Sequence, residues 1–360
     1  MADAWIGGKA ATLAAAVDTA AKLLRQSRLP VIAGLGTDVA GARAAIALAR
    51  QVGGAVDHMH SAALLRDLTV MREGGMMVTT PNEARLRADL LLLVGPGLLE
   101  AWSELPARLL ANRAGGQRRM LWLCPDDGAK GVGAGIETIG DDPADLPLLL
   151  ASLRARCAGR PGGKAPIDAP KLDALAADLP KARFGVAVWS AAEHDELTLA
   201  MLCGLVKDLN AATRFTGLPL APLDNGAAVQ QVSGWLTGFP LRTGFGRGYP
   251  EHDPWRFDAV RLVDSGEADC AVWISAFGAA APAWSRDVPL IALAQTPNGF
   301  RRPPAVTIVV GRPGIDHDAV EHLAVTGTLA SVSAGKPSKA LSAADAITQI
   351  ATALPAEQPC

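Results

Sequence analysis

Short, uninterrupted apolar segments recur along the chain and constrain its fold more than any other feature. An apolar run that lacks alternation is typical of a strand buried on both faces, as in a parallel sheet. The chain alternates these runs with segments of helical periodicity. The runs predicted as strands are Pro30–Gly34, Leu90–Gly95, Met120–Cys124, Gly185–Ser190, Cys270–Gly278, Pro289–Ala294 and Ala305–Gly311.

The segments between the runs supply the crossover helices that parallel strands require. The predicted helices include Ala10–Leu29, Val39–Val52, Glu196–Leu209 and Trp255–Ser265. Strands that alternate with helices of this length indicate a doubly wound α/β fold.

Composition limits the classes of protein to which the chain can belong. Hydrophobic residues make up 49% of its 360 residues, which is enough for two large cores. The net charge is −2 and no basic stripe with interleaved aromatic residues occurs, so nucleic acid is not an expected partner. The run Leu90–Val94 is too short to span a bilayer, and the N-terminus lacks the pattern of a signal peptide. We therefore expect a soluble cytoplasmic protein without a membrane partner.

Cysteine usage agrees with that expectation. The five cysteines are widely spaced, form no C-x-x-C pair and are odd in number. Reduced thiols in the cytosol are therefore expected. They are Cys124, Cys157, Cys203, Cys270 and Cys360, of which Cys203 lies in an apolar helical pattern that predicts a buried packing role.

Two irregular segments punctuate the chain. Residues 158–166 combine Pro, Gly and charge without periodicity, which predicts a linker between domains. The segment Leu236–Pro254 is rich in Gly, Pro, aromatic residues and Arg, and is predicted to be an ordered surface loop. Within it, Arg242, Arg247, Tyr249 and His252 are candidates for contact with a partner or an anion, and packing of the loop itself is the alternative.

A Gly34-x-Gly36-Thr37 turn follows the first strand and precedes a helix. Such a turn can direct backbone N–H groups and the positive end of a helix toward a phosphate. The dinucleotide fingerprint requires a third glycine three residues later, where this chain has Val39. A plain strand-to-helix turn that needs small residues is the alternative.

Two histidine-containing segments have spacings that invite comparison with metal sites. His58 and His60 are two residues apart at the end of a predicted strand, so both rings face the same side. Zinc accepts such ligands but needs a third, and no further His or Cys is suitably spaced. His317 and His322 are five apart, which is poor spacing for two ligands on a helix. There we expect the start of a solvated helix capped by Asp316 or Asp318.

Several segments together resemble the B subunit of formylmethanofuran dehydrogenase. The resemblance runs from about residue 5 to 350 and is most specific between Phe239 and Phe257. It rests on AWIGGKAATLAAAVDTAAKLL, PVIAGLGTDVAGARAAIALARQVGGAVDH, ARLRADLLLLVGPG, WLTGFPLRTGFGRGYPEHDPWRFDAVRLVDSGEADCAVWISAFGA and VPLIALAQTP. That family belongs to the molybdopterin oxidoreductases, in which two interwoven, Rossmann-like domains bind a tungsten or molybdenum pterin and a 4Fe–4S cluster.

The chain departs from this family where the family binds metal. The resemblance places Ala63 and Leu64 at the positions of the family's Cys-His pair, whose cysteine ligates the metal. Neither side chain has a donor atom. A 4Fe–4S cluster is held by cysteine thiolates, and the family's cysteine-rich N-terminal segment has no counterpart before Cys124. We therefore expect no catalytic residue, no metal and no cofactor in this chain.

The resemblance also implies how the chain is organised. One α/β domain is expected from residues 1–60 plus 180–310, an inserted α/β domain from 61–175, and a reduced C-terminal segment from 311–360. The N-terminal iron–sulfur domain is expected to be missing.

The function implied is that of a structural component of the bacterial formyltransferase/hydrolase complex, which resembles the dehydrogenase without its redox chemistry. That complex converts formyl-tetrahydromethanopterin to formate through a furan carrier, methylofuran or methanofuran, in one-carbon metabolism. The implied partners are its amidohydrolase-like A chain, its C chain and its formyltransferase D chain. Two alternatives remain: an active tungsten or molybdenum formylmethanofuran dehydrogenase component, and an independent nucleotide-binding α/β enzyme that uses the Gly34 turn.

Overall fold

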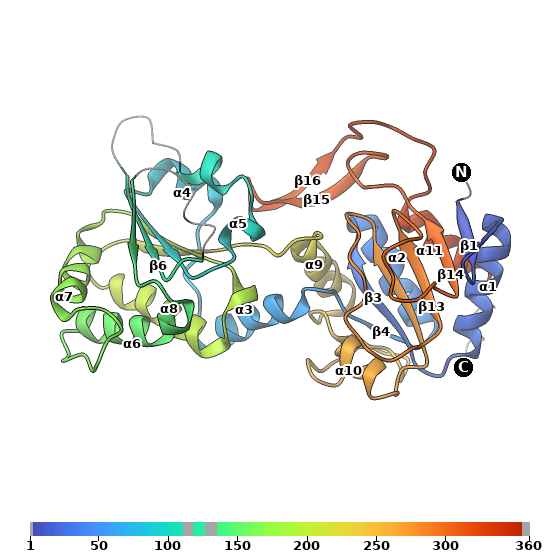
Figure 1. Ribbon diagram of the computed structural model, residues 1–360, viewed down its shortest axis with the longest axis horizontal. Coiled ribbons are helices and arrows are strands. Elements are labelled where there is room, and N and C mark those ends of the chain that lie inside the picture. Colours follow the sequence, from blue (N-terminus) through green and yellow to red (C-terminus); the bar gives the residue numbers. More distant parts are fainter. Residues whose placement is uncertain (1–2, 111–117, 127–134, 355–360) are drawn as a thin grey trace. The chain divides into compact units, whose positions relative to one another are not determined.

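The computed structural model describes residues 3–110, 118–126 and 135–354, which form two compact α/β units (Figure 1). Unit 1 comprises Met1–Ser61, Leu223–His322 and Leu329–Cys360, and unit 2 comprises Ala62–Pro222 and Leu323–Thr328. Each unit contains its own sheet with parallel strands at its centre, as the uninterrupted apolar runs predicted.

Unit 1 is built on a nine-stranded sheet. Five strands at its centre are parallel in the order β4-β3-β12-β13-β14. Antiparallel strands extend the sheet at both edges. At one edge β10 pairs with β4 and β11 with β10, and at the other edge β1 pairs with β14 and β2 with β1. The strands are β1 (Ala4–Ile6), β2 (Lys9–Ala11), β3 (Pro30–Gly36), β4 (Ala55–Val56), β10 (Thr243–Gly244), β11 (Glu251–His252), β12 (Cys270–Ser275), β13 (Leu290–Ala294) and β14 (Val306–Val309).

Helices cover the two faces of this sheet unequally. One face carries a row in which α1 packs on α11, α11 on α2, and α2 on α9 (Figure 1). The apolar cluster on the other face includes Leu262 and Val263 of α10, together with Trp273, Trp284 and Phe300. The helices of unit 1 are α1 (Leu13–Gln26), α2 (Val39–Gln51), α9 (Gly226–Thr237), α10 (Ala259–Asp264) and α11 (Ala343–Thr352).

The crossovers from β12 to β13 and from β13 to β14 contain no helix, although every residue in them is described. Residues 276–289 and 295–305 instead run as irregular segments that contain Pro282, Pro289, Pro297, Pro303 and Pro304. Proline removes a backbone donor and blocks helix continuation, which explains why these segments stay irregular.

Unit 2 contains a five-stranded, fully parallel sheet in the order β7-β6-β5-β8-β9. One apolar cluster packs α3, α6, α7 and α8 on one face, and a second packs α4, α5 and the segment Pro106–Leu110 on the other. Its strands are β5 (Leu90–Val94), β6 (Arg119–Leu123), β7 (Ile136–Ile139), β8 (Gly185–Trp189) and β9 (Phe215–Pro219). Its helices are α3 (Ser61–Gly74), α4 (Pro81–Arg87), α5 (Leu98–Ala101), α6 (Leu146–Cys157), α7 (Ala169–Asp178) and α8 (Glu196–Leu209).

The division into units differs from the expected domain boundaries. Residues 180–222 were expected in the first domain, but β8 pairs with β5 at the centre of the unit 2 sheet and carries β9 with it. Residues 158–166 connect α6 to α7 inside unit 2, so they link two helices of one core. At the C-terminus, α11 packs on α1 and α2 of unit 1.

The segment after β14 was predicted wrongly at one point. Residues 316–322 do not begin a helix but lead into the hairpin of β15 (Ala319–Leu323) and β16 (Thr328–Val332). The turn of this hairpin ends at Gly327, whose φ of 67° suits glycine. Among the described residues, no helix has both the length and the apolar character needed to cross a bilayer.

Candidate functional site

The two histidines singled out by their spacing meet at one aspartate of unit 1. Nε2 of His58 lies 3.1 Å from the backbone carbonyl oxygen of Asp224, and Nε2 of His60 lies 3.2 Å from Oδ2 of the same residue. The backbone N–H of His60 also donates to Nδ1 of His58 at 3.0 Å. We refer to His58, His60 and Asp224 as the histidine clasp.

The clasp fixes the protonation state of His58. Its Nδ1 accepts a hydrogen bond, so the ring proton is on Nε2 and is donated to the carbonyl of Asp224. Burial, followed by the positive charge that His60 can carry, lowers the pKa of His58 to about 4, although Asp224 acts in the opposite direction. Both ring nitrogens of His58 are thus engaged within the protein, and neither presents a lone pair to a metal ion.

Asn225, next to the clasp, connects three segments of unit 1. Its Nδ2 donates to the carbonyl oxygen of Thr37 at 2.8 Å, and its Oδ1 accepts from the backbone N–H of His322 at 2.8 Å. Asp224 and Asn225 have φ values of 55° and 62°, a conformation that Asp and Asn tolerate better than most residues. Sequence reasoning missed both residues, although a Leu-Asp-Asn-Gly stretch ahead of a helix is a recognisable turn signal.

The Gly34-x-Gly36-Thr37 turn lies at the carboxyl end of β3 but is occupied by the protein's own groups. A Cβ at Gly34 would lie 2.6 Å from the carbonyl oxygen of Ile274, and one at Gly36 would lie 3.1 Å from the Met59 methyl. The glycines therefore allow close approach of a neighbouring strand and loop, which is the structural alternative considered for this motif.

Electrostatics at the same turn are unfavourable for phosphate. Oδ1 of Asp38 accepts the N–H of Gly41 at 2.9 Å and so caps α2 with a buried carboxylate. Burial raises the pKa of Glu321, and repulsion by the nearby carboxylate of Asp38 raises it further. Two acidic groups at the N-terminus of α2 oppose the binding of an anion there.

Arg242 is committed to a buried ion cluster of unit 1. Its Nη2 lies 2.6 Å from Oδ2 of Asp258, and its Nε lies 3.5 Å from Oδ2 of Asp57. Burial raises the pKa of Asp57 to about 6, while Arg242 acts in the opposite direction. Nη1 of Arg242 also donates to the carbonyl of Pro254 at 2.6 Å. Arg242 therefore anchors the loop Leu236–Pro254 to the sheet instead of pointing to solvent.

The remaining candidates of this loop divide into one internal and two exposed residues. Nδ1 of His252 bonds the carbonyl of Arg242 at 3.0 Å, and the His252 ring stacks on Phe239. Arg247 and Tyr249 are exposed, and Nη1 of Arg247 lies 3.2 Å from Oε1 of Glu251. Nearby in sequence, Trp235 is 61% exposed and Trp255 is 70% exposed. We call the exposed side chains of Trp235, Arg247, Tyr249 and Trp255 the loop surface.

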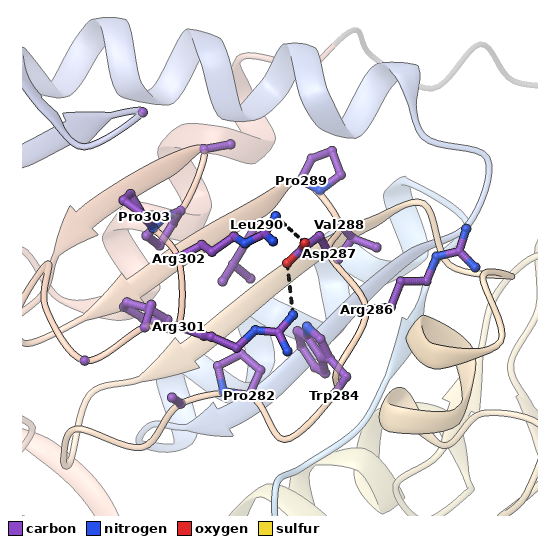
Figure 2. A pocket seen from close by; sticks show the side chains of 16 residues that line it. Pro282, Trp284, Arg286, Asp287, Val288, Pro289, Leu290, Arg301, Arg302 and Pro303 are labelled. Carbon is purple, nitrogen blue, oxygen red and sulfur yellow. Dashed lines mark hydrogen bonds and ion pairs between the residues drawn. The ribbon is translucent and has the colours of Figure 1, made fainter.

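A cavity of about 520 Å³ lies in unit 1 between the two irregular crossovers (Figure 2). Its lining includes half-buried Trp284, Leu290 and Phe300, and several prolines. Arg301 and Arg302 both reach Asp287, with Nη2 of Arg301 3.1 Å from Oδ1 and Nη1 of Arg302 against Oδ2. Sequence reasoning did not single out these residues, although the Arg-Arg-Pro-Pro stretch is visible in the chain.

Ala63 and Leu64, which the resemblance places at the metal-ligating pair of the family, lie on α3 in unit 2. Ala63 is 7% exposed and belongs to an apolar cluster with Val70 and Leu92. Leu64 is half-buried and has no donor atom. Across residues 3–110, 118–126 and 135–354, no group of three or more His, Cys, Asp or Glu side chains is arranged to hold a metal ion.

The described cysteines do not form a metal site either. They are free and distant in sequence, and Cys360 lies outside the described residues. Burial raises the thiol pKa of Cys124, Cys203 and Cys270 to about 12 and of Cys157 to about 11, so these sulfurs stay protonated at neutral pH. Because the four described cysteines belong to no group of three or more possible ligands, they do not fit a thiolate-held tungsten or molybdenum, or a 4Fe–4S cluster.

Comparison with known proteins gives a consistent set of relatives. No family model matches the chain. The chain is 38% identical over 318 residues to the B subunit of the formyltransferase/hydrolase complex Fhc from Methylorubrum extorquens, covering 86% of this chain and 85% of the relative. It is 27% identical over 276 residues to the B subunit of the tungsten-containing formylmethanofuran dehydrogenase 2 from Methanocaldococcus jannaschii. That match covers 71% of this chain but 62% of the archaeal protein.

A solved structure extends the similarity to the whole fold. The crystal structure of the formyltransferase/hydrolase complex FhcABCD from Methylorubrum extorquens, determined with methylofuran, contains a chain that matches with a TM-score of 0.86. The match has 37% sequence identity and covers 97% of this chain and 98% of that one. The protein therefore belongs to the family of the B subunit of the formyltransferase/hydrolase complex.

Proposed function

We propose that this protein is a structural, non-catalytic component of a cytoplasmic formyltransferase/hydrolase complex. The observation that carries the proposal is the pairing of family membership with apolar residues at Ala63 and Leu64. The proposed partners are the amidohydrolase-like A chain, the C chain and the formyltransferase D chain of that complex. The proposed pathway step is the conversion of formyl-tetrahydromethanopterin to formate through a furan carrier.

The chemistry of such a step explains why the complex does not need the family's redox centre. Transfer of a formyl group and hydrolysis of a formamide move no electrons between substrates. Hydrolysis needs an activated water, which a metal in a hydrolase chain supplies. A relative of the dehydrogenase that lacks thiolate ligands can then persist because its fold supports its partners.

Two observations support a role in assembly. The loop surface exposes large aromatic side chains, a residue type enriched at protein–protein interfaces. In addition, Arg242 and His252 hold the loop Leu236–Pro254 in one conformation, so its exposed residues are presented on a rigid base. Such preorganisation lowers the entropic cost of association.

Co-expression tests the proposal. The tagged protein, produced together with the A, C and D chains encoded in the same genome, should recover all three in fixed ratio on affinity purification. The purified complex should release formate from its formylated carrier and should contain no stoichiometric tungsten, molybdenum or iron by mass spectrometry. Stoichiometric tungsten or molybdenum would instead establish an active dehydrogenase component. A self-sufficient homo-oligomer that binds nucleotide would establish the second alternative.

A further inference from the structure

The cavity between the two irregular crossovers carries a surplus of positive charge. Among its lining residues are three arginines, Arg286, Arg301 and Arg302, and one acidic residue, Asp287. Asp287 can balance only one of the two guanidinium groups that it contacts. The side chains of Arg301 and Arg302 are 61% and 71% exposed, so both can reach a ligand, and Nη2 of Arg301 also donates to the backbone carbonyl of Ser285.

The three arginines do not contribute equally. A Cβ at Gly266 would collide with the guanidinium of Arg286, so this group lies against the turn that follows α10. Figure 2 shows Arg286 directed away from Asp287, whereas Arg301 and Arg302 converge on it from the opposite side. The charge available to a ligand therefore comes from Arg301 and Arg302.

Most of the cavity lining other than the arginines and Asp287 is apolar. Trp284, Leu290 and Phe300 are half-buried, and prolines 282, 289, 303 and 304 form rigid walls. Trp284 is held edge-on against Trp273, with ring centroids 5.4 Å apart, so its indole cannot swing freely. A cavity of about 520 Å³ is within the range of small-molecule sites, which combine apolar walls with a few charged groups.

We propose that this cavity binds a small organic carboxylate whose apolar or aromatic part lies against Trp284 and Phe300. Arg301 and Arg302 already hold a carboxylate, that of Asp287, and guanidinium groups recognise carboxylates through paired N–H donors. The ligand carboxylate binds the guanidinium N–H groups of Arg301 and Arg302 and neutralises the positive charge that Asp287 alone does not. The cavity is built at the amino ends of β13 and β14, so it is separate from the turn after β3 and does not depend on the proposed function.

Calorimetric titration of isophthalate into the full-length protein tests the proposal. Isophthalate combines a flat ring with carboxylates, and neutral isophthalamide has the same shape without the charge. We expect saturable binding of isophthalate that weakens with added salt, and no binding of isophthalamide. Inorganic phosphate should bind at least about tenfold more weakly because it cannot use the apolar wall. Equal binding of phosphate would contradict the role of Trp284 and Phe300.

Substitutions at the charged rim locate the binding. The double variant Arg301→Gln/Arg302→Gln should weaken isophthalate binding about tenfold or more. Arg286→Gln is the matched control, since it removes the same type of charge from a group that faces away, and it should change affinity by less than about twofold. Asp287→Asn should tighten binding several-fold, because it removes the internal competitor.

Two results would overturn the inference. One is unchanged binding by the double variant, and the other is absence of saturable binding to the unmodified protein. Circular dichroism of each variant confirms folding, and all four substituted side chains lie at the surface.

Discussion

His58 donates its Nε2 proton to the backbone carbonyl of Asp224, and this bond holds a neutral histidine in a fully buried position. The bond joins the loop that follows β4 to the loop that precedes α9. Because protonation of Nδ1 would place two N–H groups face to face, His58 and the backbone N–H of His60 cannot both keep their present partners in acid.

Acidification should therefore destabilise the protein through His58. Its folded-state pKa of about 4 lies below the ordinary value of 6.5. Its stabilising contribution is thus complete above pH 6.5 and is lost as the pH falls toward 4. The loss should be on the order of 2–3 kcal/mol, measured as the free energy of unfolding of the protein minus that of His58→Gln. A difference that stays constant between pH 7 and pH 4.5 would contradict the assignment.

Asp57 should partly mask this acid sensitivity. Its folded-state pKa of about 6 lies above its ordinary value of 3.8. The buried charge of Asp57 therefore lowers the free energy of unfolding most above pH 6 and least below pH 3.8. As the pH falls through this range, protonation of Asp57 stabilises the fold while protonation of His58 destabilises it. The Asp57→Asn variant should consequently lose stability more steeply between pH 6 and pH 4 than the unmodified protein. A shallower loss would show that Asp57 is not buried as described.

Asn225 should be sensitive to both its side chain and its backbone conformation. Asn225→Ala removes two hydrogen bonds and places alanine at a φ of 62°, which should cost about 2–4 kcal/mol of unfolding free energy. Asn225→Gly removes the same two bonds but tolerates this φ. The glycine variant should therefore be more stable than the alanine variant by about 1 kcal/mol or more in chemical denaturation. Equal stability would mean that the backbone is not strained at this position.

Restoring one ligand should not restore a metal site. Ala63→Cys places a thiol in an apolar cluster, and the described residues hold no group of three or more His, Cys, Asp or Glu side chains that could bind a metal ion. We expect this variant, produced in a host that makes tungsten and molybdenum pterins, to purify without either metal. Stoichiometric uptake detected by mass spectrometry would refute the expectation and reopen the redox function.

Arg242 and Arg247 should separate folding from assembly. Arg242→Gln leaves Asp57 and Asp258 unpaired and should lower the unfolding free energy by about 3 kcal/mol. Arg247→Glu should leave the unfolding free energy nearly unchanged, because its side chain is exposed, yet it should weaken recovery of partner chains. Lys22→Glu is the matched control, since α1 packs beside β14 and β1 at the opposite edge of the sheet. Equal loss of assembly in both charge reversals would reject the loop surface as an interface.

Fold class and most strands could be predicted from the sequence because the physical signal is local. Leu90–Val94 and Cys270–Ser275 are buried along their whole length, as apolar runs without alternation indicate. The helix predicted at Glu196–Leu209 has those bounds in the structure, with Asp195 as its N-cap. The segment 316–322 was predicted wrongly because its Asp and His residues also suit the start of a helix. The hairpin forms only when β16 pairs with β15, and the local sequence does not show this pairing.

The candidate site depended on contacts that no local pattern contains. Spacing alone placed His58 and His60 side by side, but their shared partner is 164 residues away along the chain from His60. In the same way Arg242 is a candidate partner contact by sequence and an internal anchor by structure, since Asp57 and Asp258 converge on it only after folding.

The sequence by itself determined two properties of this protein: parallel α/β sheets, and the absence of donor atoms at Ala63 and Leu64. Both follow from the chemistry of single residues and their immediate neighbours. Only the tertiary structure decided which polar residues are internal and which face solvent, as for Arg242 and Arg247. The physical reason is that burial, ion pairing and pKa are set by groups brought together from distant segments, and sequence spacing carries no record of them.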